Sequence, residues 1–453
     1  MPRRKPQNLE PSNKTTVNGE DKNIRQTVVM FADIIGASEI SNHEELKNYA
    51  KIVRDFQELF KQLCKDFEEA WSENVPGFVY NAKGDEGYLM IYPEDNESDV
   101  SIHIDAAINI ALELKRRWLW SDYNKKRINN GLLPIELGIG IHAGKTYLME
   151  DKKPKEHAKL EGYAINLAKR VESESRKGRF SHIFLSEAAY GHVMNLADEK
   201  TYIFDQPQKM TPKGISGNIW VYEIKHHFLP SDWKEETETP KKTLIDPEQI
   251  NMEILKKALE INPTNLWLTE ESIRASLLKE EFGKAGEQAK KLIQSNQRDA
   301  GAYFIQGLVQ GECGNYKNER DMYKRAIEHT EQLAEAHWYM GLSYSYEVLD
   351  IVGIKKDLNK IGKENIDKVE KALENYKKAL EYSPQSAWMH YDYGCELIRW
   401  YGENKTKLEQ GIDQIIIAAN RLDSVRDKIP KEDYLEKALG HPKIKELMKK
   451  AKN

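Results

Sequence analysis

The residues that could do chemistry lie in three short stretches. The first is VVMFADIIGASEI, residues 28–40, in which Asp33 follows β-type apolar residues and precedes Gly36. A buried strand has little use for an unpaired carboxylate. Either the strand ends in a turn and Asp33 caps a helix that starts near Ser41, or the carboxylate binds a cation. On this stretch alone the helix cap is the simpler interpretation.

The other two stretches are ambiguous when each is taken singly. Asp85 follows Gly84 between two β-type runs, and Gly-Asp is a common turn sequence. Asn166 and Arg170 are four residues apart, so they share one face of an expected helix, as many surface pairs do. Two hard carboxylates at one place would suit Mg²⁺ or Mn²⁺. The chemistry therefore depends on whether the fold brings these residues together.

The elements that must position them alternate between strand and helix from Thr27 to about Lys225. Strand patterns cover 27–34, a hairpin at 77–92, a strand pair within 133–149, the first part of 182–194, and 219–224. Helix patterns cover 43–71, 98–120, 162–176 and the second part of 182–194. Hairpins among the strands favour an α+β sandwich over a fully parallel sheet.

The second half of the chain has a helical pattern to its end. Residues 226–243 are polar and contain two prolines, which predicts a linker. Beyond it the Ala302/Gly307 spacing recurs 34 residues later, the length of a tetratricopeptide repeat, and Gly394 continues the series after one insertion. The sequence thus predicts a tetratricopeptide-like solenoid over 244–453, with a concave face for a partner; the alternative is an irregular helical bundle.

Composition excludes several other classes. With 453 residues the chain has room for two or three domains, and 40% apolar residues suffice for real cores. A net charge of −5 without a long basic stripe disfavours nucleic acid as the main partner. Three distant cysteines favour reduced thiols in a cytoplasm. No apolar run approaches the roughly 20 residues of a membrane span, and the polar residues 1–26 are expected to form a disordered tail.

Taken together and in order, the motifs of residues 27–225 resemble the catalytic domain of class III nucleotide cyclases. The family's F-x-D-I-x-G is matched by Phe31, Asp33, Ile34 and Gly36, and its hairpin G-D by Gly84 and Asp85. Its G-I-H-x-G is matched by Gly140, Ile141, His142 and Gly144, and its G-x-x-V-N-x-A-x-R by Gly162, Ile165, Asn166, Ala168 and Arg170. The resemblance implies a ferredoxin-like α+β sandwich, followed here by the all-α solenoid.

The resemblance also implies a reaction and its residues. In this family the ribose 3′-hydroxyl attacks the α-phosphate and pyrophosphate leaves, with two Mg²⁺ or Mn²⁺ ions in each active site. Asp33, Asp85 and the carbonyl of Ile34 would hold the metals. Asn166 would orient the ribose, and Arg170 would stabilise charge on the α-phosphate. Since the family takes these two groups from opposite subunits, a homodimer is implied.

The residues expected to read the base depart from both purine patterns. Three residues before the two motif glycines, adenylate cyclases have Lys and Asp, and guanylate cyclases have Glu and a small polar residue; this chain has Asn81 and Lys159. Tyr49 with Arg54 resembles the Y/R-A-x-x-x-R signature of the pyrimidine cyclases of anti-phage Pycsar systems, although Tyr49 also fits the apolar stripe of its helix. Lys213 lies near the position of the family's phosphate-binding lysine.

These resemblances predict a cytoplasmic pyrimidine cyclase that converts UTP to 3′,5′-cyclic UMP and signals in anti-phage defence. A protein partner or a phage-derived trigger is expected at the helical repeats. The alternatives are a cytidylate cyclase and an adenylate cyclase with atypical base contacts. A non-catalytic regulator is a third alternative, which the presence of Asp33, Asp85, Asn166 and Arg170 disfavours.

Overall fold

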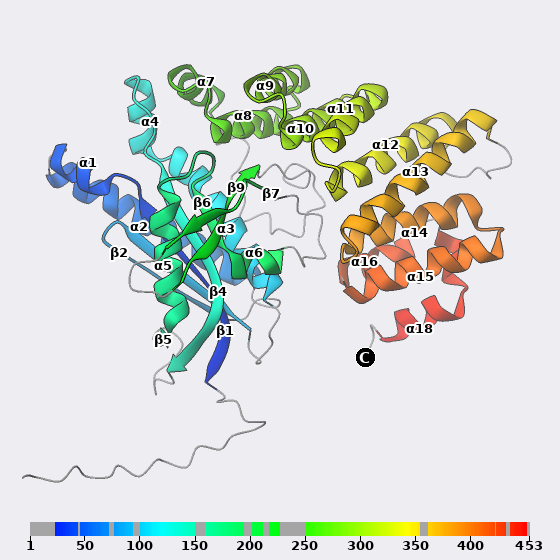
Figure 1. Cartoon of the computed structure of the whole chain (residues 1–453), viewed down its shortest axis with the longest axis horizontal. Helices are drawn as coiled ribbons and strands as arrows, with labels where there is room; N and C mark the ends of the chain where they lie inside the picture. The colour runs from blue at the N-terminus through cyan, green and yellow to red at the C-terminus, as the bar shows by residue number, and fades with distance from the viewer. Residues whose placement is uncertain are drawn as a thin grey trace, which may run out of the picture.

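The structure is a computed structural model, and it describes residues 23–43, 46–71, 77–93, 100–149, 159–193, 202–211, 217–226, 251–353, 361–421, 423–431 and 435–450. One part is built on a sheet, and the other is an arc of helices that begins above the sheet and continues beside it (Figure 1). The expected α+β domain followed by an all-α region is confirmed. Within the described residues no helix is both long and apolar enough to span a membrane.

A mixed sheet carries the first part of the chain. Its strands run in the order β2-β3-β1-β4-β6-β9-β7, with β5 on β4 and β8 on β9, and all pairs are antiparallel except β4 with β6. The strands are β1 (Ile24–Ile34), β2 (Gly77–Lys83), β3 (Glu86–Tyr92), β4 (Leu137–Met149), β5 (Lys159–Glu161), β6 (Ile183–Ser186), β7 (Ile203–Phe204), β8 (Gln208–Met210) and β9 (Ile219–His226). The expected hairpin over 77–92 is confirmed, and β1 begins three residues before the expected start of the domain.

The predicted strand pair over 133–149 is wrong, because these residues form the single 13-residue strand β4. Two glycines of this strand let a helix approach it closely. A Cβ atom on Gly140 would lie 2.1 Å from the backbone nitrogen of Glu172, and one on Gly138 would lie 2.7 Å from the Ser175 hydroxyl. Both contacts come from α5 (Tyr163–Ser175), which therefore packs directly on β4.

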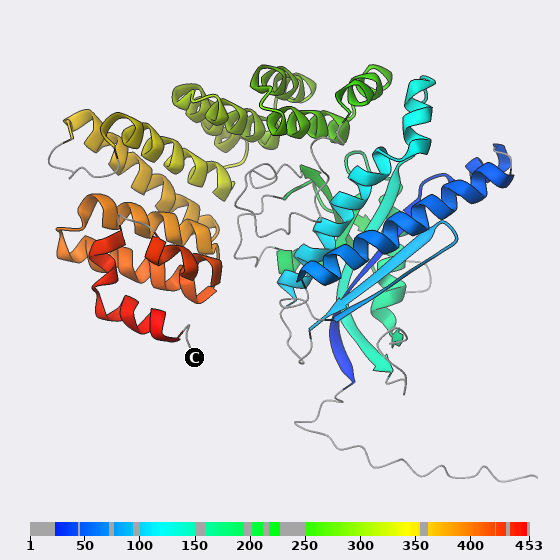
Figure 2. The same ribbon diagram turned by 180° about the vertical axis from the view of Figure 1, so that it is seen from behind.

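Helices cover the two faces of the sheet unequally. The long helices α2 (Leu46–Trp71) and α3 (Ser101–Leu119) lie on one face, and α5 lies on the other (Figures 1 and 2). The shorter helices are α1 (Ala37–His43), α4 (Asp122–Asn129) and α6 (Glu187–Val193), so the predicted helix over 43–71 is α2 alone, with α1 before it. Successive side chains of β1 point to opposite faces of the sheet. Met30 packs in the core with α2, and Phe31 packs in a cluster with Ala168 of α5. Asp33 is two residues after Phe31 on the same strand, so its side chain points to the face of the sheet that α5 covers.

The second part is entirely helical among its described residues. Its elements are α7 (Met252–Ile261), α8 (Leu266–Leu278), α9 (Phe282–Ser295), α10 (Ala300–Glu312), α11 (Tyr316–His329), α12 (Ala334–Val352), α13 (Lys363–Tyr382), α14 (Ala387–Tyr401), α15 (Lys405–Arg421), α16 (Asp423–Lys428), the 3₁₀ turn η5 (Ile429–Lys431), α17 (Glu436–Leu439) and α18 (Pro442–Lys450). The predicted linker begins at His226, which is instead the last residue of β9. Residues 227–243 and the tail up to residue 22 lie outside the described residues.

Two of the repeated glycines of this part, Gly307 and Gly341, lie where an aromatic ring of the next helix packs, whereas Gly394 instead faces Gly411 and Ile415 of α15. A Cβ atom on Gly307 would lie 2.3 Å from the ring of Tyr323, and one on Gly341 would lie 2.8 Å from the ring of Tyr376. Both tyrosines are buried. The equivalent glycines thus have equivalent partners, although 53 residues separate the two tyrosines and 34 separate the two glycines.

Candidate functional site

The two acidic residues of the cyclase-like motifs lie together at one end of the sheet. Asp33 is the penultimate residue of β1, and the N–H of Ile34 donates to the carbonyl of Asp85 over 3.3 Å. Gly84 has a φ of +62°, which a glycine adopts readily, so the turn between β2 and β3 can be tight. The Gln57 side chain of α2 donates to the Gly84 carbonyl over 2.8 Å and braces this turn.

Asp33 is a buried carboxylate without sufficient positive charge around it. Burial raises its pKa to about 7, the negative charges of Glu172 and Asp85 add to this increase, and Lys169 and Arg176 only partly oppose it. Its Oδ2 pairs with Arg176, while its Oδ1 is buried and has no hydrogen-bond partner among the described residues. Because α1 begins at Ala37 and neither oxygen accepts from a described backbone N–H, the carboxylate is not a helix cap. A buried, unpartnered oxygen beside a second carboxylate is a fitting ligand for a divalent cation.

The chain supplies only part of a metal coordination shell. Among the described residues, no three His, Cys, Asp or Glu side chains gather in a way that could hold a metal ion. Mg²⁺ is commonly bound by one or two carboxylates together with waters and substrate phosphates. Asp33 and Asp85 thus fit a site whose remaining ligands come from a backbone carbonyl, such as that of Ile34, and from a phosphorylated substrate.

Three charged residues complete the site, two from α5 and one directly after its end, and the sequence analysis missed them. Lys169 pairs with Glu86 and lies 3.0 Å from Glu172, and Arg176 lies 3.4 Å from Glu172 in addition to its contact with Asp33. Burial acts against the charge of Lys169, but Glu86 and Glu172 outweigh it and raise the lysine pKa. The helical spacing of residues 169, 172 and 176 is the one signal that could have found them, since it places all three on one side of α5.

Asn166 and Arg170 do not meet the carboxylates within one chain. Both lie on α5, as predicted, and both are exposed. The structure gives neither residue a contact with Asp33 or Asp85 among the described residues. At the start of the same helix, Tyr163 is 57% exposed, an unusual amount for so large an apolar side chain.

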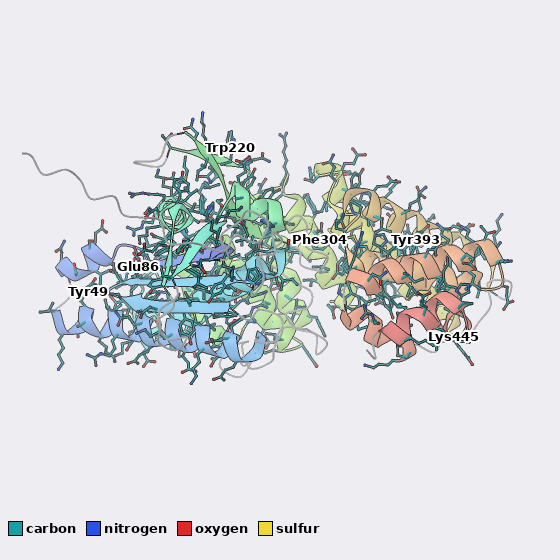
Figure 3. The ribbon with its side chains drawn as sticks, turned by 90° about the horizontal axis from the view of Figure 1, so that it is seen from below. Tyr49, Glu86, Trp220, Phe304, Tyr393 and Lys445 are labelled. Carbon is teal, nitrogen blue, oxygen red and sulfur yellow. The ribbon has the colours of Figure 1, made fainter. Side chains whose placement is uncertain are left out.

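Tyr49, one of the residues expected to read the base, lies near the carboxylates. Burial raises its pKa, and the charges of Asp85 and Asp33 raise it further. Figure 3 shows Tyr49 at the same end of the sheet as Glu86, the strand partner of Asp33. Arg54 is exposed on α2.

The remaining expected residues are placed less completely. Asn81 is exposed on β2, where its Oδ1 accepts a 2.8 Å hydrogen bond from the N–H of Ala82. The backbone of Lys159 pairs with Met149 in β5, but its side chain lies outside the described residues. Lys213 also lies outside them.

Residues 20–227 match the family model described as the adenylate and guanylate cyclase catalytic domain. Together with the sheet, the Asp33 and Asp85 pair and the order of the motifs, this match shows that residues 20–227 form a class III nucleotide cyclase catalytic domain.

Several solved structures are similar to this chain. The adenylyl cyclase CyaB from P. aeruginosa is 15% identical over 46% of this chain and 97% of its own, with a TM-score of 0.36. The guanylate cyclase domain of RhGC from Catenaria anguillulae, in complex with GTP, is 21% identical over 44% of this chain and 94% of its own, with a TM-score of 0.32. MamA is 19% identical over 40% of this chain and 90% of its own, with a TM-score of 0.29. No curated protein matches the sequence.

Proposed function

We propose that this protein is a homodimeric pyrimidine cyclase that converts UTP to 3′,5′-cyclic UMP and pyrophosphate. The observation that carries the proposal is the buried Asp33 carboxylate, which has an unpartnered oxygen beside Asp85 and the ring of Tyr49 close to both. The two carboxylates suit cation-dependent chemistry on phosphate. The aromatic ring suits a small base.

Three groups at the end of β1 and in the β2–β3 turn are expected to hold the metal ions. Asp33, Asp85 and the Ile34 carbonyl would hold two divalent cations, which when bound lower the pKa of the attacking hydroxyl and neutralise the leaving pyrophosphate. The position of Asp33 is fixed by pairing with Gly138 on one side and Glu86 on the other. A carboxylate held in this way loses no further freedom when it binds, so its geometry is preorganised.

The exposed Asn166 and Arg170 support a site shared between two chains. A catalytic arginine that stabilises the α-phosphate must contact it, yet Arg170 points to solvent within one chain. In a homodimer the two residues of one subunit would serve the carboxylates of the other. The exposed Tyr163 on the same helix supports a protein contact at this surface.

Two side chains support uracil as the base. The ring of Tyr49 near Asp33 and Asp85 would narrow the pocket, and steric overlap rejects a purine more strongly than a lost hydrogen bond does. Because the Asn81 Oδ1 already accepts from the backbone, its exposed amide N–H groups are the ones that face a ligand. Such donors, with Lys159 as a further donor, favour the carbonyl edge of uracil over the amino group of cytosine.

The test is a competition assay with equal UTP, CTP, ATP and GTP, purified full-length protein and Mn²⁺, followed by identification of the cyclic products. Cyclic UMP is expected as the main product. Cyclic CMP as the main product would overturn only the argument from the Asn81 and Lys159 hydrogen-bond donors. Cyclic AMP would favour an adenylate cyclase with atypical base contacts. Tyr49→Ala is expected to raise the purine share of product, whereas Tyr49→Phe, which keeps the ring, is expected not to.

The wider role follows from the pyrimidine assignment. We propose that the cyclic nucleotide is a cytoplasmic signal in anti-phage defence and that the helical region is tetratricopeptide-like and binds the partner or trigger. The matching glycine and tyrosine contacts along this region support a repeat. A product assay in infected and uninfected cells tests the role, and equal cyclic UMP in the two would oppose it.

A further inference from the structure

The helical region contacts the cyclase domain through α7, through α8 and through Asp299, the N-cap of α10, and one of the α8 contacts lies close to the Asp33 loop. Two of the anchors are far from the site: Glu271 pairs with Arg116 of α3 over 3.0 Å, and Glu270 pairs with His226 at the end of β9. Both pairs are buried. The third anchor is at the N-terminus of α8 and involves Glu136, the residue before β4.

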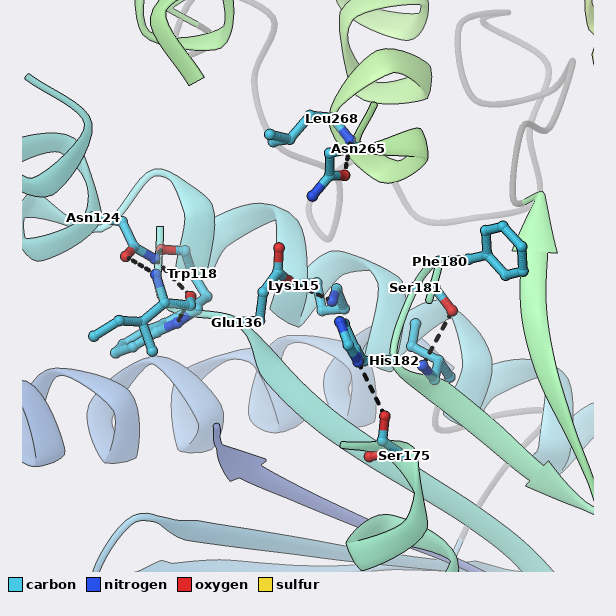
Figure 4. A network of polar contacts seen from close by, with 12 residues as sticks. Lys115, Trp118, Asn124, Glu136, Ser175, Phe180, Ser181, His182, Asn265 and Leu268 are labelled. Atoms are coloured by element: carbon cyan, nitrogen blue, oxygen red, sulfur yellow. Dashed lines mark hydrogen bonds and ion pairs between the residues drawn. The ribbon is translucent and has the colours of Figure 1, made fainter. Parts of the chain in front are cut away.

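Glu136 contacts the α8 N-terminus through its side chain. Its Oε2 lies 2.8 Å from Lys115 Nζ of α3, and Lys115 in turn lies 4.9 Å from the centre of the Trp267 ring. Burial acts to raise the pKa of Glu136, but Lys115 and a hydrogen bond from Asn265 outweigh it, so this pKa is lowered. Figure 4 shows Asn265 of the helical region directed toward Glu136 and Lys115.

The orientation of Asn265 is fixed by its second role. Asn265 is the N-cap of α8, and its Oδ1 accepts from the N–H of Leu268 over 3.0 Å. With the oxygen so engaged, the amide N–H₂ group is the part that can donate to Glu136. The cavity beneath Trp267 is only about 10 Å³, room for about one water, so these groups are closely packed.

Glu136 contacts the active-site loop through its backbone. Its carbonyl accepts a 3.0 Å hydrogen bond from the N–H of Ile35, two residues after Asp33. Ile34, between them, carries the carbonyl expected to bind metal. One residue thus holds the α8 N-terminus with its carboxylate and the metal loop with its carbonyl.

A second path from the same pair leads to α5. The charges of Lys115 and Glu136 both act on the His182 ring. The Nδ1 atom of His182 lies 3.0 Å from the carbonyl oxygen of Ser175, the last residue of α5. His182 has a φ of 56°, an uncommon conformation for a non-glycine residue, so the surrounding contacts hold it in place. Ser175 directly precedes Arg176, which contacts Asp33.

We propose that Glu136 is a positioning residue that transmits the placement of the helical region to the metal-binding loop. When α8 is seated, Asn265 and Lys115 fix Glu136, and Glu136 fixes Ile35. A partner that shifts α8 moves the Trp267 ring away from Lys115 and the Asn265 amide away from Glu136 (Figure 4), and this loosens the loop. The helical region therefore regulates the cyclase through the shape of residues 33–35. This inference rests on the proposed function only in assigning the metal to that loop.

The test uses the same substitution at two helix N-caps of the full-length protein. Asn265→Asp keeps an oxygen to cap α8 but replaces the donor with a carboxylate that repels Glu136. Asn251→Asp is the control, because Asn251 caps α7 in the same way, accepting from Glu253 and Ile254. Glu136→Gln is a second variant, which keeps the side-chain shape and removes the charge paired with Lys115.

The main readout is amide hydrogen exchange, which does not depend on catalysis. Exchange at Ile35 is expected to be about fivefold faster in Asn265→Asp and Glu136→Gln, as suits the loss of a modest stabilising contact, and unchanged in Asn251→Asp. The dissociation constant for Mn²⁺, measured without nucleotide, is also expected to rise about fivefold in Asn265→Asp and Glu136→Gln. Unchanged Ile35 exchange in both would overturn the proposal and leave the cyclase assignment intact.

Discussion

Replacing Asp33 with asparagine is expected to stabilise the metal-free protein while abolishing turnover. The reason is that the folded protein holds this carboxylate, which is 8% exposed, with a pKa of about 7 against an ordinary value of 3.8. At neutral pH the chain must ionise the group against burial and against the charges of Glu172 and Asp85. An amide of the same shape removes that requirement.

The difference between the two pKa values sets the magnitude. It corresponds to about 4 kcal/mol as a ceiling on the gain in unfolding free energy at pH 7. Asparagine also gives up the ion pair with Arg176, whose side chain is 44% exposed, so that pair stabilises little. A net gain of about 2 kcal/mol is expected, equivalent to roughly 4–8 °C in the melting temperature of a domain of this size.

The sign of the pH dependence follows from the raised pKa of Asp33. Its protonated form stabilises the fold fully below about pH 3.8, and this stabilisation is lost as the pH rises to about 7. The melting temperature of Asp33→Asn should therefore exceed that of wild type, and the difference should grow from about pH 5 to pH 7 and then level off. Melting temperatures measured across this range, in buffers without divalent cations, give the profile.

Two comparisons make the result decisive. Mn²⁺ should raise the melting temperature of wild type much more than that of Asp33→Asn, because the substitution removes one of the two carboxylates expected to bind the cation. Asp321→Asn, at an exposed position of α11, should leave the melting temperature unchanged. A lower stability of Asp33→Asn at pH 7.5 would refute the reasoning, since it would mean that Asp33 serves as a structural partner of Arg176.

Three further predictions concern the dimer and the helical region. Mixed Asp33→Ala and Arg170→Ala chains should regain cyclase activity that each lacks alone, because one site of the mixed dimer is intact; no recovery after proven subunit exchange would place the site within one chain. His226 has its pKa raised to about 9, because Glu270 and Asp299 outweigh its burial, so wild-type stability should fall between about pH 6.5 and 9. That fall should be missing in His226→Gln, and its persistence there would contradict the assignment. Gly307→Ala should destabilise the protein by about 1–3 kcal/mol in urea unfolding by forcing Tyr323 aside, whereas Gly283→Ala, with open space around it, should not.

Each of the two metal-binding candidates has a local signal in the sequence, but only the resemblance to class III cyclases selected Asp33 and Asp85 as a pair. Gly36 and Gly84 both have positive φ values, 76° and 62°, in the turns beside Asp33 and Asp85. A turn that needs a glycine is visible in the sequence, and so is an apolar run that ends at a carboxylate. Neighbouring strands then bring the two turns together without any further information.

The charged residues of α5 could not be predicted in this way, because their role depends on how the helix docks. Lys169, Glu172 and Arg176 resemble the solvated face of a surface helix. They reach Asp33 only because Gly138 and Gly140 let α5 lie directly on β4. The predicted strand pair within 133–149 gave no place for a helix on one continuous strand, so the docking of α5 could not be foreseen.

The contact between the two parts was hidden for a related reason. His226 begins a polar stretch and was assigned to the linker, yet in the structure it lies between Glu270 and Asp299, which are 44 and 73 residues further along the chain. A buried histidine between two carboxylates has no signature in sequence spacing. The helical region follows a visible repeat along its own length, whereas its placement against the sheet depends on single pairs of this kind.

The balance of charge at the site explains why a cation should precede the nucleotide. Within reach of the loop lie four acidic side chains and two basic ones: Asp33, Asp85, Glu86, Glu172, Lys169 and Arg176. Because the acids outnumber the bases, the protein alone repels a triphosphate and attracts divalent ions. Arg176 occupies one oxygen of Asp33, so a cation reaching that oxygen would release a guanidinium able to contact phosphate. A metal ion bound at Asp33 would thus relieve the unfavourable burial of this carboxylate and free the Arg176 guanidinium for a substrate phosphate.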